Sequence, residues 1–165
     1  MKNLKHQLVR HGYWFQLNKL HYKELKKRIK KNEGFSSNPY KDQLGYLTIG
    51  YGHLILHNET HLIKNKTSKS QLKEIFIKDF NRALNDYKKL IKQKTYNKKD
   101  EELLIEMAFQ MGAKNVLLFK KLLLNMKKKN KHLVCFEMMN SLWYNQTPNR
   151  VKNLIKVFLS NEQRK

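Results

Sequence analysis

Residues 32–54 read NEGFSSNPYKDQLGYLTIGYGHL, and this stretch decides the fold. Upstream of it, apolar residues four positions apart among strong helix formers predict a helix over residues 22–31. Gly34 suits the position just past a helix end, where a left-handed backbone is needed. We therefore expect Glu33 to lie at the carboxyl end of a helix.

The second half of the same stretch predicts a small sheet. Residues 35–45 are rich in turn formers such as Ser, Asn, Pro, Asp and Gly. Residues 46–53 alternate as a strand does, with Leu47, Ile49 and Tyr51 on one face. Two or three short strands around these turns would form a small antiparallel lobe.

The rest of the chain has helical patterns. Ser68, followed three residues later by Gln71, forms a capping box that opens a helix running to about Lys92. That helix is long enough to join two lobes. Further helices are expected over residues 100–111, about 116–126, about 131–143 and from Pro148 onward, where Thr147-Pro148 is a start signal.

We therefore expect one mainly helical α+β domain made of two lobes. The β lobe would cover about residues 34–67 and the helical lobe about residues 93–165, joined by the long helix. Residues 1–22 would form a basic N-terminal extension. The single cysteine, Cys135, lies in an apolar run and is expected to be a buried, inert thiol.

The charge is strongly positive and unevenly distributed. The chain carries 35 Lys and Arg against 13 Asp and Glu, a net charge of +22. Residues 1–32 contribute +9 and residues 113–165 contribute +10, whereas residues 33–112 contribute only +3. A polyanionic partner is implied, either nucleic acid, anionic lipid or an acidic envelope polymer. The chemistry is better sought in the balanced middle.

Two carboxylates and a hydroxyl in that middle segment have spacings that suit glycosidic cleavage. Such cleavage uses one carboxylic acid to protonate the leaving oxygen and one carboxylate to activate water or stabilise positive charge. Glu33 suits the acid, because the helix dipole and partial burial against Phe35 and Tyr46 disfavour its ionised form. Asp42 is in a polar loop and is expected to stay ionised, with Thr48 on the strand that follows. On spacing alone, two solvated surface carboxylates remain the alternative.

Three motifs in order resemble the phage-type lysozymes, glycoside hydrolase family 24. The first is residues 32–54, which resemble that family's catalytic segment. The second is Met107-Ala108-Phe109-Gln110-Met111-Gly112, which is similar to its central-helix motif. The third is WYNQTPNR at residues 143–150, similar to a signature late in the family's sequences. The resemblance covers roughly residues 24–158 and implies a lysozyme-like fold.

The resemblance also implies an activity and its residues. The family hydrolyses the β-1,4 bond between N-acetylmuramic acid and N-acetylglucosamine in peptidoglycan, with inversion. Glu33 falls on the general acid, Asp42 on the second carboxylate and Thr48 on the threonine that positions water. Arg150 falls on the arginine that pairs with the acid. Inversion implies carboxyl groups roughly 6.5–9.5 Å apart, which leaves room for a water molecule.

Other positions have supporting roles by the same resemblance. His53 and Asp79 fall on an ion pair, to which we assign a structural role. Leu54, Phe109 and Gln110 fall on sugar-cleft positions, and Glu137 stands where the family has an amide. A core position is nearly as plausible for Phe109, and Trp143 is expected in the core rather than as a sugar platform. No cofactor and no metal are implied.

The expected setting is host cell lysis by an endolysin-type enzyme. Its substrate would be peptidoglycan, with anionic envelope polymers or lipid bound through the basic ends, and without specific nucleic-acid binding. We expect a monomer made in the host cytoplasm that reaches the wall or periplasm after membrane permeabilisation, with a pore-forming partner for release. The alternative is a catalytically inactive cationic protein that binds wall or membrane. Residues 1–22 would be either an added helix or frayed tail, or a basic amphipathic segment that holds the enzyme on anionic envelope polymers or lipid.

Overall fold

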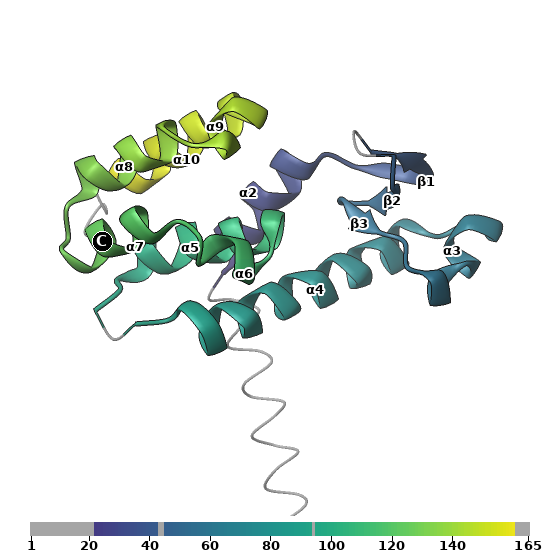
Figure 1. Ribbon diagram of the computed structural model, residues 1–165. Coiled ribbons are helices and arrows are strands. Elements are labelled where there is room, and N and C mark those ends of the chain that lie inside the picture. The colour runs from purple at the N-terminus through teal and green to yellow at the C-terminus, as the bar shows by residue number, and fades with distance from the viewer. Residues whose placement is uncertain (1–21, 43–44, 94, 161–165) are drawn as a thin grey trace, which may run out of the picture.

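The computed structural model of this chain has two lobes joined by a long helix (Figure 1). It describes residues 22–42, 45–93 and 95–160, so the predicted N-terminal extension lies outside the described residues except for Tyr22. The elements are α2 (Lys23–Glu33), β1 (Ser36–Lys41), β2 (Leu47–Gly50), β3 (His53–Leu54), η1 (His57–Glu59), α3 (His61–Lys64), α4 (Lys69–Asp86), η2 (Tyr87–Ile91), α5 (Lys98–Met111), α6 (Ala113–Val116), α7 (Lys120–Lys127), α8 (Lys131–Met139), α9 (Leu142–Gln146) and α10 (Pro148–Leu159). The predicted fold class, a mainly helical α+β chain with a small antiparallel sheet, is confirmed.

Helix α2 ends where the sequence predicts. It buries Leu25 and Ile29 and ends at Glu33, and Gly34 follows with φ 72°. That backbone angle is in the region that L side chains avoid, so glycine stops the helix without strain. The end of α2 therefore points Glu33 towards the start of the β lobe.

The sheet differs from its prediction in two places. Its strand order is β1-β2-β3, all antiparallel. Residues 46–53 are not one strand, because the chain turns after Gly50 and His53 begins β3. Residues 36–41, expected as turns, form β1 with an irregular register between Ser36 and Tyr40. As an edge strand, β1 tolerates Pro39, which cannot donate a backbone hydrogen bond.

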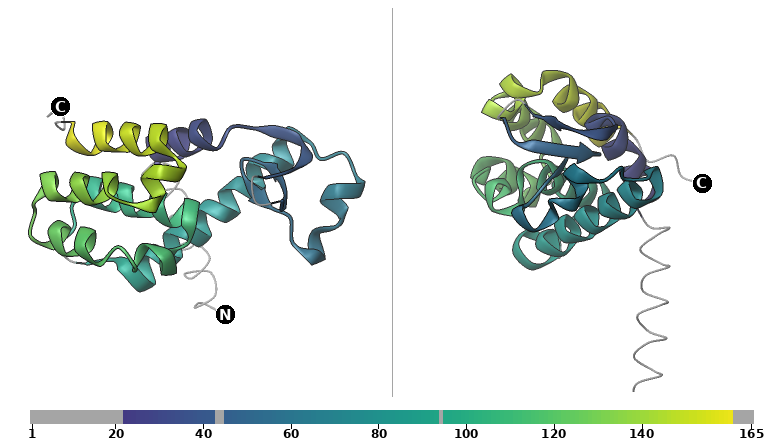
Figure 2. Two further views of the ribbon diagram at one scale, coloured as in Figure 1. Left: turned by 45° about the horizontal axis from the view of Figure 1, so that its top comes forward. Right: turned by 90° about the vertical axis from the view of Figure 1, so that its right-hand side faces the viewer.

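Helix α4 connects the lobes and shares its residues between their cores. Its capping box is confirmed: the Ser68 hydroxyl accepts from the Gln71 amide N–H, and the Gln71 side chain accepts from Ser68 N–H. Leu72 packs with the β-lobe core residues Ile49 and Leu62, whereas Phe76 and Phe80 belong to the main core. The helix continues as the π-helical turn η2 to Ile91, close to its predicted end. The left view of Figure 2 shows α4 running between the lobes.

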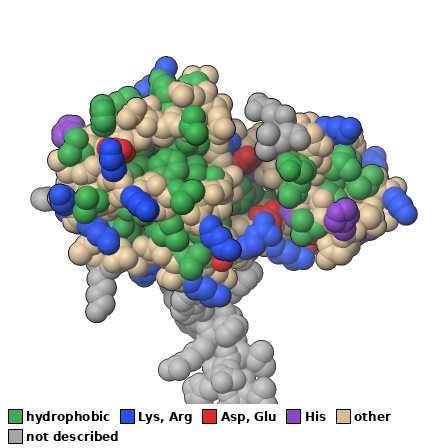
Figure 3. All heavy atoms as spheres, viewed as in Figure 1, with side chains coloured by type: hydrophobic (Ala, Val, Ile, Leu, Met, Phe, Trp, Pro, Cys, Tyr) green, Lys and Arg blue, Asp and Glu red, His purple; other side chains and the backbone are tan. Residues whose placement is uncertain are grey.

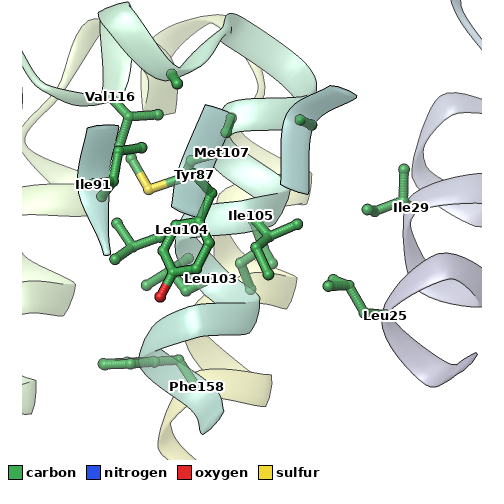
Figure 4. Packing of buried hydrophobic residues seen from close by; sticks show 14 of the residues in the cluster. Leu25, Ile29, Tyr87, Ile91, Leu103, Leu104, Ile105, Met107, Val116 and Phe158 are labelled. Carbon is green, nitrogen blue, oxygen red and sulfur yellow. The ribbon is translucent and has the colours of Figure 1, made fainter. Parts of the chain in front are cut away.

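The helical lobe is built around α5, whose residues 103–108 are buried in succession. Figure 4 shows side chains of α5, η2 and α2 gathered in this core, with Phe158 of α10 beside them. None of the helices in the described ranges has the length and apolarity needed to cross a membrane.

Two predicted helices differ from the structure. The helix expected over about 116–126 is mainly α7, because Phe119 just before it leaves helical geometry at φ −77° and ψ 54°, and the short helix α6 that ends at Val116 was not predicted. The helix expected over about 131–143 is α8 and α9. Ser141 interrupts it, since its hydroxyl caps the Tyr144 N–H of α9. A serine that offers a backbone donor its own oxygen favours a new helix start over continuation.

Candidate active site

Glu33 is held from the helical lobe by Arg150. An Arg150 Nη1–H donates to Glu33 Oε1 at 3.0 Å, and Nη2–H donates to the carbonyl oxygen of Asn32 at 2.8 Å. The side chains of both charged residues are largely buried, at 13% exposed for Arg150 and 18% for Glu33. The contact expected between them is present, and the planar guanidinium fixes the direction of the carboxylate.

Glu33 is confined on its other side by the β lobe. Gly52, in the turn between β2 and β3, has φ +77°, and a Cβ built on it would lie 3.0 Å from Glu33 Oε2. The predicted burial of Glu33 against two aromatic rings needs correction. The Phe35 ring packs on Tyr51 with centroids 5.0 Å apart, and Tyr46 is 57% exposed. The carboxylate lies instead between Arg150 and the glycine turn, at the junction of the lobes.

Asp42 and Thr48 lie beside this junction, Asp42 just after β1 and Thr48 on β2. Asp42 follows β1, and its Oδ1 accepts from the N–H of Tyr46 at 2.9 Å. Thr48 on β2 is buried, and its hydroxyl donates to the Tyr46 carbonyl at 3.3 Å. A single turn therefore fixes both side chains.

Tyr40 lies within the electrostatic influence of both Glu33 and Asp42. It pairs with Thr48 across the sheet. Burial raises the pKa of Tyr40 above its ordinary value, and the charges of Glu33 and Asp42 raise it further. The charges of both carboxylates therefore act on one phenol, which indicates that Glu33 and Asp42 both lie near Tyr40.

A pocket of about 280 Å³ lies between the lobes next to this group. Figure 3 shows the surface hollowed between the lobes, with acidic side chains around the hollow. Leu54 lines the pocket from the β lobe, Phe109 and Gln110 line it from α5, and Asp79 and Arg82 line it from α4. The structure thus brings together three of the residues predicted at sugar positions. Glu137 is half-buried on α8, and it is not among the described residues that line this pocket.

The floor of the pocket is supported from the core. Phe109 packs on Phe76 with ring centroids 5.6 Å apart, so it belongs to the core as well as to the pocket wall. Trp143 is 5% exposed and its Nε1–H donates to Gln110 Oε1 at 2.9 Å. The prediction that Trp143 is a core residue is confirmed, and its hydrogen bond orients the Gln110 side chain.

His53 and Asp79 form the predicted contact, within a larger cluster. His53 Nδ1 lies 2.8 Å from Asp79 Oδ2, and Nε2 lies 3.0 Å from Glu59 Oε2. The hydrogen bond to Asp79 raises the pKa of His53 above its ordinary value. Burial acts in the opposite direction, and the contact with Glu59 raises the pKa further. Because the folded state binds this proton more tightly, the cluster stabilises the fold below the unfolded pKa of histidine. That stability is lost as pH rises through the folded value. Sequence reasoning missed Glu59, which no local pattern marks.

A second buried carboxylate was also missed. Glu106 on α5 is 3% exposed, and it accepts from Arg28 Nε–H at 2.7 Å and from Asn32 Nδ2–H at 2.8 Å. Burial raises the pKa of Glu106, and the Arg28 charge opposes that rise. The available signal was an acidic residue inside an otherwise apolar run, where a charge needs a partner.

Other chemistry has little support in the described part of the chain. Within residues 22–42, 45–93 and 95–160, no three His, Cys, Asp or Glu side chains converge as a metal site requires. Cys135 is a buried free thiol, as predicted, and burial raises its pKa.

Comparison with known proteins places this chain in a family. The family model described as phage lysozyme matches residues 30–159. Probable T4-type lysozyme 2 of Dictyostelium discoideum is 35% identical, over 81% of this chain and 92% of that protein. Probable T4-type lysozyme 1 of the same organism is 32% identical, with the same coverage of both chains. The peptidoglycan hydrolase gp36 of Pseudomonas phage phiKMV is 30% identical over 79% of this chain, but only 14% of that larger protein is covered. On the family match and these identities, the chain belongs to the phage lysozyme family.

Proposed function

We propose that this protein hydrolyses peptidoglycan as an N-acetylmuramidase, cutting the β-1,4 bond between N-acetylmuramic acid and N-acetylglucosamine. The observation that carries the proposal is the position of Glu33 at the lobe junction, fixed by Arg150, with Tyr40 of β1 under the charges of both Glu33 and Asp42. The neighbouring pocket, which shares Gly52 with the surroundings of Glu33, is available to part of the substrate. The names of the relatives, two lysozymes and a peptidoglycan hydrolase, support the same substrate class.

In the proposed reaction, the two carboxyl groups divide the work. Glu33 gives its proton to the glycosidic oxygen as the bond from that oxygen to the anomeric carbon breaks. Asp42 accepts a proton from a water molecule that attacks the anomeric carbon from the opposite face, which inverts its configuration. Thr48 on β2 holds that water by its hydroxyl. One bond to oxygen breaks and another forms, and the proton lost by Glu33 is replaced from Asp42 through solvent.

The remaining predicted residues position the reactants in this proposal. Arg150 orients the Glu33 carboxylate, and Leu54, Phe109 and Gln110 contact sugar rings in the pocket. Glu137 is assigned a more distant contact with the substrate. The site of action we propose is the bacterial wall or periplasm, where the excess positive charge of the chain favours contact with acidic polymers.

Release of new reducing ends from purified peptidoglycan tests the proposal. The wild-type protein should release them, and Glu33→Gln should lower the rate by about 100- to 10,000-fold, the usual contribution of a general acid. Asp42→Asn should cause a loss of similar size. Glu74→Gln, an exposed carboxylate on α4, serves as the matched control and should keep the wild-type rate.

The alternative function gives a different result. A cationic protein that binds wall without cutting it is favoured only by the net charge of +22. Such a protein would sediment with peptidoglycan and release no reducing ends, and none of the three substitutions would change its behaviour. Wild-type activity that survives Glu33→Gln would refute the assigned acid while leaving hydrolysis intact.

A further inference from the structure

We propose that Glu106 is a positioning residue for Glu33, acting through Asn32 and Arg150. It holds the last turn of α2 in the orientation that lets one arginine grip both Asn32 and Glu33. This inference rests on the proposed function, because it treats Glu33 as the acid. Nothing in the mechanism above uses Glu106, although it is among the most deeply buried charged side chains in the described part of the chain.

Both oxygens of Glu106 are used to bind α2. Oε2 accepts from Arg28 at 2.7 Å and Oε1 accepts from Asn32 at 2.8 Å, so one carboxylate clamps residues in successive turns of that helix. Arg28 also reaches Glu102, one turn earlier on α5, at the longer distance of 3.6 Å. The short contacts identify Glu106 as the main polar contact of α5 with α2.

Asn32 contacts both Glu106 and Arg150, and so links the two. Its side chain is held by Glu106, and its carbonyl oxygen accepts from Arg150 at 2.8 Å. Carbonyl groups in the last turn of a helix have no partner within the helix. Arg150 supplies that partner and, with its other nitrogen, binds the adjacent Glu33 side chain. Any movement of Asn32 therefore moves the point on which the guanidinium is seated.

Stability alone gives a poor account of this arrangement. A carboxylate 3% exposed must lose nearly all its hydration, and an apolar pair of similar volume often stabilises a fold at least as well. What an apolar pair lacks is a directed acceptor for the Asn32 amide. The cluster has two arginines, Arg28 and Arg150, and three carboxylates, Glu33, Glu102 and Glu106, with Asn32 between them. In this geometry Arg28 pairs with Glu102 and Glu106, whereas Arg150 pairs with Glu33.

Replacement of Glu106 by Gln is the first test. The NH2 group that replaces one oxygen can only donate a hydrogen bond. Because Arg28 and Asn32 are also donors, one of their two hydrogen bonds to this side chain is lost. Displacement of the reacting group should lower kcat by about 10- to 100-fold while KM stays within about twofold. Glu102→Gln is the matched control, because it lies on the same helix and contacts the same arginine without touching Asn32. Its kcat and KM should stay within about twofold of the wild type.

A double variant separates positioning from stability. In Arg28→Met with Glu106→Met, both charges are removed together and the apolar pair should restore thermal stability. The proposal predicts that kcat remains lowered by about tenfold or more, because Asn32 has lost its acceptor. Recovery of wild-type kcat together with stability would overturn it. So would a Glu106→Gln variant whose kcat equals that of Glu102→Gln.

A spectroscopic readout keeps the inference testable apart from catalysis. NMR of the Arg150 guanidinium should show restricted rotation in the wild type and freer rotation in Glu106→Gln, with Glu102→Gln unchanged. Unchanged Arg150 signals in Glu106→Gln would contradict the inference even if the enzyme is active. Wild-type protein that releases no reducing ends would instead refute the proposed function, and the NMR comparison would still decide whether Glu106 positions Arg150.

Discussion

Gly52→Ala is the substitution whose effect on the proposed acid follows most directly from the coordinates. A Cβ at this position would lie 3.0 Å from Glu33 Oε2, 3.6 Å from its carboxyl carbon and 3.8 Å from its Cβ. Ordinary contacts of a Cβ begin at 3.4 Å, so the carboxylate must retreat by a few tenths of an ångström. Its other oxygen is bound to Arg150 at 3.0 Å, so this retreat also disturbs that hydrogen bond.

The substitution has two separate effects, one on folding stability and one on kcat. A non-glycine residue at φ +77° costs about 1–2 kcal/mol of folding stability. A displacement of this size in a reacting group is expected to lower kcat by about 10-fold, with 100-fold as the value for a full ångström. In free-energy terms, tenfold corresponds to about 1.4 kcal/mol of transition-state stabilisation.

The assay is kcat for release of reducing ends, measured together with thermal unfolding. Gly50→Ala is the control, because its φ is +68° and the added Cβ would lie 3.3 Å from the Leu72 side chain, so the crowding falls on the β-lobe core and not on Glu33. It should lose a similar amount of stability while kcat stays within about threefold of the wild type. Equal kcat values in the two variants would refute the steric argument, and so would wild-type kcat in Gly52→Ala.

Three further predictions concern stability and reactivity. Asp79→Asn should lower the melting temperature by about 4–10 °C at pH 5, which corresponds to roughly 2–3 kcal/mol for a charged hydrogen bond. The loss should shrink as pH rises through the folded pKa of His53, and a loss that does not change between pH 5 and pH 9 would contradict the raised pKa of His53. Ser68→Ala should cost about 1 kcal/mol in chemical denaturation by removing the cap of α4, and an unchanged midpoint would argue against that cap. Cys135 should react with a thiol reagent only as fast as the protein unfolds, and rapid reaction of the folded protein would show that the thiol is accessible.

The parts of the fold that local signals specify were predictable from sequence. The end of α2 at Glu33 follows from the glycine after it, and the start of α4 follows from the Ser68 capping box. The strand β1 was missed because its residues have turn-forming side chains. Pairing with β2 gives this edge segment its extended form, and the propensities of its own residues do not predict that pairing.

The contacts that define the site connect distant parts of the chain. Arg150 and Glu33 are 117 positions apart, and Arg28 and Glu106 are 78 apart. The first pair was expected only because the sequence resembles a family that has it. The second pair had no such guide, and neither did the approach of Gly52 to Glu33. Periodicity describes which face of a helix is buried, but it does not say which polar group on another helix will meet it.

The identity of the sugar at the new reducing end tests the central claim most directly. Peptidoglycan digested by the protein would be reduced with borohydride, and the reduced fragments would be separated by chromatography and their terminal sugar identified by mass spectrometry. The account predicts reduced N-acetylmuramic acid from the wild type and none above background from Glu33→Gln. Reduced N-acetylglucosamine as the product, or the same yield of reduced N-acetylmuramic acid from Glu33→Gln, would contradict it.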